Sequence, residues 1–361
     1  MNYLERVGRT RQRMETLGVD VLLATCGPDL TYLTGYEAIP LERLTALVLG
    51  RGDDPVLVVP RLEEARVEQR PDVFTVETWN EDEDPVERVA ARMRSAQVVA
   101  VADHAPARLL LALQGALPRA RFIPASLVTS PLRATKDEAE VSLLQAAATA
   151  VDVIAEGLRA RRLAGRTERE IQRLLVELML DAGHDRANFA IVATGPNSAS
   201  PHHESSDRRV NTGDVVLCDF GGTMHSYCSD ITRMFVVDAV KPEVQDAYDA
   251  LSLAQETAFS SATVGTPCQE VAATARAVLA RSDVADRFIH RIGHGIGLEA
   301  HEDPYLVVGN ETRLAPGHSF SIEPGVYFPG RFGLRIEDIV VADVTGPQRL
   351  NSAPRDLAVV E

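Results

Sequence analysis

The sequence contains few cysteines, and their spacing excludes the sites that cysteines usually build. The cysteines are Cys26, Cys218, Cys228 and Cys268. They form no C-x-x-C pair and no dense cluster, which argues against a disulfide scaffold. We therefore expect reduced thiols, as in a cytoplasmic protein.

Long apolar runs and an excess of positive charge are also missing. No apolar run reaches the length of about 18 residues that a membrane span needs, so none is expected. The opening residues, MNYLERVGRTRQRMETLG, predict an amphipathic helix and lack the apolar core of a signal peptide. The chain carries 37 basic and 52 acidic side chains, a formal net charge of −15. This balance disfavours binding to nucleic acid or to an anionic membrane.

The length of 361 residues predicts two domains. Over residues 1–130, strand-like and helix-like segments alternate, which predicts an α/β domain with a parallel or mixed sheet. Strands are expected at 20–25, 44–50, 55–60, 72–79 and 96–103, and helices at 61–69, 84–95 and 106–117. A polar, charged stretch at 130–145 marks the boundary with the second domain.

Residues 131–361 predict a domain in which helices accompany a mostly antiparallel sheet. A long apolar-periodic helix starts at Glu138. Another starts after Thr167, whose spacing to Glu170 is that of a capping box, and Gly183 suits its C-terminal end. Strands are expected at 189–194, 214–220, 224–237 and 317–343, and further helices at about 242–261 and 267–281. The whole chain is therefore expected to be of the α+β class.

Two aspartates interrupt a stretch that otherwise predicts buried strand. Asp219 follows the apolar run VVLC, and Asp230 comes after the pair Gly221–Gly222, which we interpret as a turn or bulge. A hairpin at these glycines would bring two like charges together, and buried carboxylates need cations or hydrogen-bond donors. The alternative is that each aspartate only caps the backbone of a turn.

Histidines and glutamates in later segments supply further candidate ligands. The segment IHRIGHGIGLEAHEDP (289–304) holds His290, His294 and His301. Its glycines at 293, 295 and 297 would let the backbone come close to a ligand. Glu323 interrupts the apolar run FSIEPGVYF, and Glu337 lies in the strand-like GLRIEDIVV. For Glu337 the alternative is a structural ion pair with Arg335.

Two aspartates, two glutamates and one histidine form an oxygen-rich ligand set with a single imidazole. Such a set suits Mn²⁺, Fe²⁺, Co²⁺ or Zn²⁺. Four carboxylates exceed the need of one ion, whereas two ions about 3.5–4 Å apart with shared carboxylates would use them all. In many aminopeptidases this arrangement activates a water molecule and polarises a carbonyl.

These segments resemble the pita-bread metallopeptidases, in the branch of prolidase (Xaa-Pro dipeptidase) and aminopeptidase P. The resemblance covers essentially the whole chain. LTYLTGYE (30–37) is typical of the amino-terminal creatinase-like domain, LRATKDEAEVSLL of the boundary, and the ligand positions follow in the family's order. The resemblance implies an α/β creatinase-like domain (1–130) and a pita-bread catalytic domain (131–361).

The resemblance also implies a role for each ligand. Asp219, Asp230 and Glu337 would hold one metal ion, and Asp230, His294, Glu323 and Glu337 would hold the other. Asp230 and Glu337 would bridge the two ions, expected to be Mn²⁺, with Co²⁺ or Zn²⁺ as alternatives. A hydroxide bridging the ions would attack the scissile carbonyl, with Glu323 as general base.

Other positions match the family's substrate-contacting residues. In SPHHESS, the first of the two adjacent histidines, His202, would contact the reacting centre. His301 would hydrogen-bond the substrate carbonyl or the tetrahedral intermediate, and His290 would line the pocket for the proline ring. Arg335 stands two residues before the bridging glutamate and would orient it.

Selectivity within the branch depends on how the far end of the substrate is bound. A prolidase must bind the carboxylate of a dipeptide, which calls for a cation. Arg43 and Arg331 are candidates, and the alternative for Arg43 is an ordinary surface arginine. The compact chain favours a prolidase. The alternatives are aminopeptidase P, which leaves this end open for longer peptides, and a non-catalytic binding protein, which the complete ligand set disfavours. The family implies a homodimer.

Overall fold

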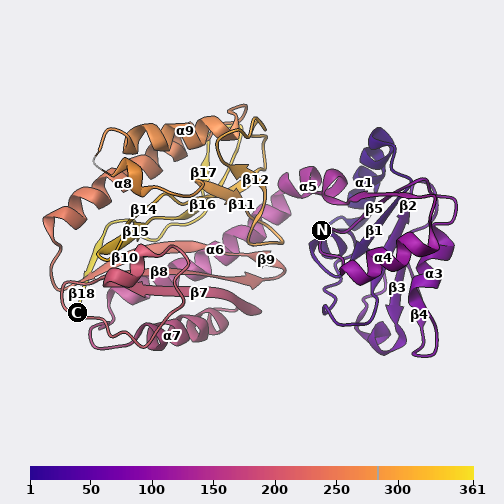
Figure 1. Ribbon diagram of the computed structural model, residues 1–361, viewed down its shortest axis with the longest axis horizontal. Coiled ribbons are helices and arrows are strands. Elements are labelled where there is room, and N and C mark those ends of the chain that lie inside the picture. Colours follow the sequence, from indigo (N-terminus) through magenta and orange to yellow (C-terminus); the bar gives the residue numbers. More distant parts are fainter. Residues whose placement is uncertain (283) are drawn as a thin grey trace. The chain divides into compact units, whose positions relative to one another are not determined.

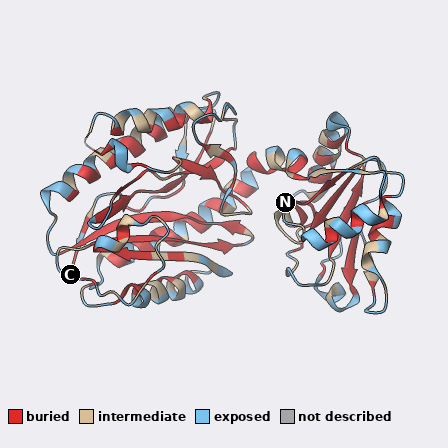
Figure 2. Cartoon of the chain, in the orientation of Figure 1, coloured by how far each residue is buried: buried red, intermediate tan, exposed pale blue. Residues whose placement is uncertain are grey.

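The computed structural model describes residues 1–282 and 284–361, which divide into two compact units, Met1–Arg133 and Ala134–Glu361. Both units combine helices with sheet (Figure 1). Most strands are buried, shown red in Figure 2, and the exposed positions gather on the helices and loops. Each unit is therefore built around β-sheet of its own.

The first unit contains a six-stranded mixed sheet in the order β4-β3-β2-β1-β5-β6. Strand β1 runs antiparallel to β2 and parallel to β5. The strands are β1 (Val21–Thr25), β2 (Ala46–Gly50), β3 (Val56–Pro60), β4 (Thr75–Trp79), β5 (Val98–Val101) and β6 (Arg121–Pro124). The helices are α1 (Tyr3–Leu17), α2 (Pro28–Thr34), α3 (Pro85–Arg92), α4 (Ala107–Ala116) and α5 (Ser126–Ala134), with the 3-10 helix η1 (Arg61–Arg66). The mixed sheet confirms the expectation from the sequence.

Several details of this unit differ from the expectation, among them the helices α2 and α5, which the sequence analysis did not predict. The helix expected at 61–69 is the short 3-10 helix η1. The edge strand β6 was not expected, because it is exposed at both ends and lacks the continuous apolar run that marks β1, β2 and β3. Fully buried central strands carry the stronger sequence signal.

The second unit contains two larger sheets and a two-stranded one. Their orders are β18-β10-β8-β7, with β9 paired to β8, then β12-β11-β13-β16-β17, and β14-β15. The strands are β7 (Arg186–Thr194), β8 (Val215–Met224), β9 (Tyr227–Cys228), β10 (Ile231–Val237), β11 (Gly293–Gly295), β12 (Glu302–Leu306), β13 (Ser319–Ile322), β14 (Gly325–Phe328), β15 (Phe332–Arg335), β16 (Asp338–Val341), β17 (Gln348–Arg349) and β18 (Ala358–Val360). The helices are α6 (Glu138–Arg159), α7 (Glu168–Asp181), α8 (Pro242–Ser261) and α9 (Cys268–Leu279), with the 3-10 helices η2 (Gly195–Ala199) and η3 (Ala285–Arg287).

Strand β8 separates two apolar cores. Val216 and Cys218 on one face pack with α6 and α7, whereas Val215 and Leu217 on the other face pack with α8 and α9. In Figure 1, α7 and the pair α8 and α9 lie on opposite sides of these strands. Side chains alternate along a strand, so Asp219 shares the face of Val215 and Leu217. That face looks toward the second sheet.

Helix α6 is long and apolar enough, by length and composition alone, to cross a membrane. It spans 22 residues, and an 18-residue window within it has a mean hydropathy of 1.4. Its start is fixed by a capping box between Asp137 and Glu140. Its buried residues Leu144, Ala148 and Val151 lie in the apolar cores of the second unit, which is the pattern of a core helix. The capping box of Thr167 and Glu170 that was expected for α7 is confirmed.

The hairpin that carries the two aspartates turns later than the sequence suggested. Strand β8 continues through Gly221 and Gly222, and the turn is formed by His225 and Ser226, with φ of 49° and 71°. The prediction of a turn at the glycines was wrong, although the register between β7 and β8 does shift opposite them, as in a bulge. A Cβ on Gly221 would collide with the carbonyl oxygen of Ser229, so glycine here permits the close approach of the two backbone segments of the hairpin.

Candidate active site

Strand pairing places the two aspartates on one face of the first large sheet. Asp219 on β8 lies opposite Thr232 on β10. Asp230 precedes Thr232 by two residues and therefore points to the same side. Both carboxylates are buried, and oxygens of Asp219, Asp230 and Glu337 lie within 4.8 Å of one another.

The glutamates come from the second large sheet. Glu337 pairs with Thr232 through an isolated bridge. In the ladder between β13 and β16, Ile322 lies opposite Asp338. Glu323 follows Ile322 and Glu337 precedes Asp338, so the two glutamates are the next pair along this ladder. The bridge at Thr232 thus brings carboxylates from both sheets together.

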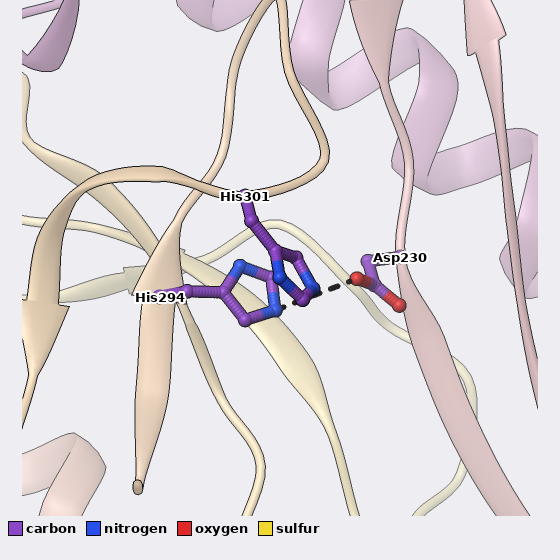
Figure 3. A group of neighbouring side chains, drawn as sticks. All are labelled: Asp230, His294 and His301. Carbon is purple, nitrogen blue, oxygen red and sulfur yellow. Dashed lines mark ion pairs between the residues drawn. The ribbon is translucent and has the colours of Figure 1, made fainter. Parts of the chain in front are cut away.

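His294 on β11 completes the cluster. Its amide donates to the Ser321 hydroxyl (3.2 Å), and its Nδ1 lies 3.1 Å from the carbonyl oxygen of Gly295. That contact assigns the proton to Nδ1, so Nε2 is left as the lone-pair atom that faces the carboxylates. Nε2 lies 3.3 Å from Glu323, 3.8 Å from Asp230 and 3.9 Å from Glu337. Figure 3 shows the His294 ring directed toward Asp230.

The glycines around His294 serve another purpose than the one expected. A Cβ on Gly293 would collide with the carbonyl oxygen of Ser321, and a Cβ on Gly295 with that of Asp303. These glycines let β11 fit between β12 and β13. They act by allowing close approach between strands.

The predicted substrate histidines line the same cavity as the ligand cluster. His202, His290 and His301 all border this cavity of about 820 Å³. The adjacent His203 is turned elsewhere, since its Nε2 lies 2.8 Å from Glu168. The structure therefore places the two neighbouring histidines in different surroundings, and the catalytic role expected for His202 stays a prediction.

His301 lies directly against His294. Their ring centroids are 3.8 Å apart, and Figure 3 shows the two rings side by side next to Asp230. Arg291 donates to Nδ1 of His301 (3.1 Å), which assigns the His301 proton to Nε2. His301 thus presents an N–H donor, as a residue that binds an oxygen atom needs.

Arg335 contacts a different carboxylate from the one expected. Its guanidinium forms an ion pair with Asp219. Its connection to Glu337 runs through Thr232, whose hydroxyl accepts from Arg335 Nε (3.2 Å) and donates to Glu337 (2.7 Å). The Arg335 guanidinium also donates to the hydroxyl of Tyr327 (2.9 Å). Arg335 therefore holds the Asp219 side of the cluster directly.

Sequence reasoning missed three polar residues of the site. Tyr327 links Arg335 to His290, whose Nε2 lies 3.0 Å from the tyrosine hydroxyl. Thr232 joins the two sheets, and its position two residues after Asp230 is the available sequence signal. Arg291 borders the cavity and stacks over the ring of Tyr305 at 4.5 Å. Arg291 lies next to a predicted site histidine, which could have identified it.

The two arginines proposed for the substrate carboxylate lie among other charges. Arg43, in the first unit, is 2.6 Å from Glu42 and 2.7 Å from Glu81, with a 31% exposed side chain. Arg331 is exposed and forms an ion pair with Glu243. Their roles in substrate binding stay predictions.

Burial and like charges act strongly on the acidic cluster. Burial raises the pKa of Asp230 well above its ordinary value, and the charges of Glu337 and Asp219 raise it further. Burial likewise raises the pKa of Glu337, with repulsion from Glu323 adding to it. For Glu323, burial raises the pKa to about 7. Cations would relieve this repulsion.

The cluster fits divalent metal ions by its donor set. Among the described residues, Asp219 Oδ1 and Asp230 Oδ1 are buried side-chain oxygens without a hydrogen-bond partner. Buried polar atoms of this kind call for an explanation. Carboxylates combined with one neutral imidazole suit Mn²⁺, Co²⁺ or Zn²⁺. The chain's own residues thus form a site that such ions fit.

Comparison with known proteins identifies the family. Residues 142–343 match metallopeptidase family M24. The chain belongs to this family. Residues 6–135 match the creatinase/prolidase N-terminal domain. As an M24 member, the chain is an enzyme, a peptidase, and the resemblance to the pita-bread metallopeptidases is confirmed.

Relatives of this M24 chain match it over nearly its whole length. The probable dipeptidase PepE of Mycobacterium tuberculosis is 40% identical over 363 residues, covering 99% of this chain and 96% of the relative. Dipeptidase PepE from Mycobacterium ulcerans has a TM-score of 0.93 at 41% identity, covering 99% and 98% of the two chains. A recombinant prolidase from Thermococcus sibiricus has a TM-score of 0.95 at 34% identity, covering 100% of both. These neighbours confirm the expected fold class.

Glu323, Asp230 and Glu337 are expected to lower the stability of the metal-free M24 enzyme as the pH rises from about 4.5, the ordinary pKa of a carboxyl group, to about 7 and above. The folded-state pKa of Glu323 is raised to about 7, and those of Asp230 and Glu337 are raised well above their ordinary values. A raised pKa gives stability that is present at low pH and is lost as the pH passes through the folded-state value. Burial lowers the pKa of His294 to about 3. This residue therefore adds stability to the folded state as the pH rises, mainly below about pH 6.5.

Thermal unfolding in EDTA across this pH range, repeated with Mn²⁺, measures the effect. With metal bound, the decrease should disappear, because the ions replace the protons on the carboxylates. A metal-free melting temperature that increases over the same range would contradict the expectation.

Proposed function

We propose that this chain is a dinuclear-metal peptidase that hydrolyses the Xaa-Pro bond of dipeptides. Among the described residues, three overlapping groups could hold a metal ion, and the proposal rests on the two that share Glu337; the third is Asp230, His294 and His301. Asp219, Asp230 and Glu337 form one cluster, and His294, Glu323 and Glu337 form the other, each with ligand atoms within 4.8 Å. The relatives named dipeptidase and prolidase support the choice of reaction.

The proposed roles of the ligands are those that the resemblance to the family implies. Asp219, Asp230 and Glu337 would hold one ion, and Asp230, His294, Glu323 and Glu337 the other. When bound, the two ions would act as Lewis acids toward a water molecule and the substrate carbonyl.

Glu323 is proposed as general base. It is a partly buried carboxylate beside His294, and its pKa of about 7 suits a group that takes and returns a proton near neutral pH. Its position at the edge of the cluster gives it access to the cavity.

The remaining cavity residues bind and orient the substrate in this proposal. His301 presents its Nε2–H to the carbonyl oxygen, and His202 assists at the reacting centre. His290 is partly buried, and this burial lowers its pKa to about 4, so it stays neutral and offers a largely apolar ring to the proline. Arg335 and Tyr327 hold Asp219 and His290 in place.

A panel of peptides tests the function. With Mn²⁺ restored, a Xaa-Pro dipeptide should be cleaved with a kcat/KM at least about 100-fold above that of the matching Xaa-Ala dipeptide, a preference of about 2.7 kcal/mol. A Xaa-Pro-Yaa tripeptide should be the poorer substrate. Faster cleavage of the tripeptide would favour an Xaa-Pro aminopeptidase, and cleavage of none of these peptides would favour a binding protein.

Arg43→Ala tests how the substrate carboxylate is bound. If Arg43 binds it, KM for a Xaa-Pro dipeptide should rise about tenfold, a loss of about 1.4 kcal/mol, and KM for the tripeptide should change less. Arg61→Ala, an arginine in the same unit that also pairs with a glutamate, is the control. An equal effect of Arg43→Ala on both peptides would remove the role.

Further parts of the proposal concern the protein's state. Mn²⁺ is proposed as the physiological ion, and metal analysis of the purified protein tests it.

The four free cysteines support a reducing, cytoplasmic location. We also propose a homodimer, and a division of labour in which 131–361 is catalytic and 1–130 is the creatinase-like domain.

A further inference from the structure

A buried carboxylate outside the ligand cluster is tied to one loop of the cavity. Glu168 is the first residue of α7, and its side chain is fully buried. The loop 194–206 runs from the last residue of β7 through η2 to Ser206. Ser200, Pro201 and His202 of this loop border the cavity. Glu168 is therefore placed where it can act on the loop that carries a proposed catalytic histidine.

Glu168 contacts both ends of this loop. One carboxylate oxygen accepts from the Thr194 amide (2.8 Å) and hydroxyl (2.9 Å), at the start of the loop. The other accepts from the Ser206 amide (2.9 Å) and hydroxyl (2.6 Å), at its end. Asn197, within η2, donates to both oxygens (3.0 and 3.2 Å). A single side chain thus closes the loop at its base.

The same carboxylate also holds the residue next to His202. His203 Nε2 lies 2.8 Å from it. Hydrogen bonding to a fixed, ionised acceptor restricts the His203 side chain, and with it the peptide that joins His203 to His202. The carbonyl oxygen of Pro201, on the other side of His202, accepts from Arg335 (3.3 Å). His202 is therefore held between two anchored neighbours.

The electrostatics of Glu168 agree with this role. Burial opposes ionisation, but hydrogen bonds from Ser206 and His203 outweigh it and lower the pKa of Glu168 to about 2. The residue is consequently an anion throughout the neutral range. A charged acceptor makes stronger hydrogen bonds than a neutral one, and without such bonds a loop would have the mobility usual for surface segments.

We propose that Glu168 is a positioning residue that fixes loop 194–206 and so holds His202 in its place at the cavity. The inference rests on the proposed function insofar as His202 contacts the reacting centre. It assigns a catalytic consequence to a carboxylate that lies away from the metal ligands. Glu168 would act through His202 and touch neither substrate nor metal.

The test is a double-mutant cycle in the full-length, Mn²⁺-loaded enzyme. Glu168→Gln keeps the shape but turns one acceptor oxygen into an NH₂ group that faces donors. Glu168→Gln is expected to lower kcat for the best peptide substrate by at least about tenfold, with an unchanged metal content. In the His202→Ala background the same change should alter kcat by less than about twofold, because the two residues act as a unit. Glu177→Gln, at an exposed glutamate further along the same helix, is the matched control.

Two results would overturn the inference. Glu168→Gln could lower kcat by the same factor in both backgrounds, which would mean that it acts independently of His202. Glu168→Gln could also have no more effect on kcat than the control Glu177→Gln. If Glu168→Gln does not fold, His203→Ala takes its place in the cycle, because it removes one contact and leaves the others.

A second measurement separates this inference from the proposed function. The imidazole NMR signals of ¹⁵N-histidine-labelled enzyme, with His202 assigned from the His202→Ala variant, report on the loop without any substrate. A shifted or broadened His202 signal in Glu168→Gln supports positioning even if no Xaa-Pro peptide is cleaved. An unchanged His202 signal overturns it even if the enzyme is a prolidase.

Discussion

Asp230→Asn is expected to lower kcat for the peptide substrate by roughly 10³-fold or more, equivalent to about 4 kcal/mol of activation free energy. Asp230 belongs to the cluster with Asp219 and Glu337, and it lies 3.8 Å from His294. An amide has the same shape but no charge, so it would bridge two cations poorly. Metal content should fall together with activity.

The same variant should behave differently once the metal is removed. In EDTA near pH 8, Asp230→Asn should be more stable than the wild type, because it removes a buried charge whose pKa is raised by burial and by Glu337. Asp246→Asn, on the exposed face of α8, should change neither activity nor stability. A metal-free variant less stable than the wild type would show that Asp230 is a structural residue rather than a metal ligand.

Arg335→Met is expected to destabilise the metal-free enzyme by about 3–5 kcal/mol, the cost typical of breaking a buried ion pair. Its guanidinium is buried and pairs with Asp219, and it donates to Tyr327 and Thr232. Methionine fills similar volume without the charge, so Asp219 would remain beside two other buried carboxylates. Urea unfolding in EDTA measures the loss.

Metal and a matched arginine provide the controls for this prediction. Mn²⁺ should recover part of the lost stability, because a cation bound at Asp219 replaces some of the missing charge. Arg331→Met, on an exposed arginine paired with Glu243, should cost less than about 1 kcal/mol. Equal losses for the two variants would mean that the Arg335 pair contributes no more than a surface contact.

The candidate site combines short-range signals that the sequence carries with long-range contacts that it does not. Asp219, Asp230, Glu323 and Glu337 are visible in the sequence because each places a carboxylate in an apolar, strand-like run. The period of two along a strand then gives the face on which each lies. The sequence does not show which strands lie side by side, because Thr232 and Glu337, which pair through an isolated bridge, are far apart in the chain.

The wrong predictions about the glycines came from contacts between residues that are far apart in the sequence. Gly221 and Gly222 have the composition of a turn, but the pairing of β8 with its neighbours carries the strand past them to His225. Gly293 was interpreted as making room for a ligand, whereas it makes room for the carbonyl of Ser321 on the next strand. Local composition indicates that the backbone is unusual at such places, but the neighbouring strand decides what the unusual backbone is for.

The sequence by itself determined the apolar periodicity, the capping box of α7, the set of acidic and histidine side chains, and through their order the family. The tertiary structure alone decided that Arg335 pairs with Asp219, that His203 turns to Glu168 while His202 borders the cavity, and that Thr232 joins the two sheets. The physical reason is that helix periodicity and caps arise from residues a few positions apart. Ion pairs and strand registers depend on segments that come together only when the whole unit folds.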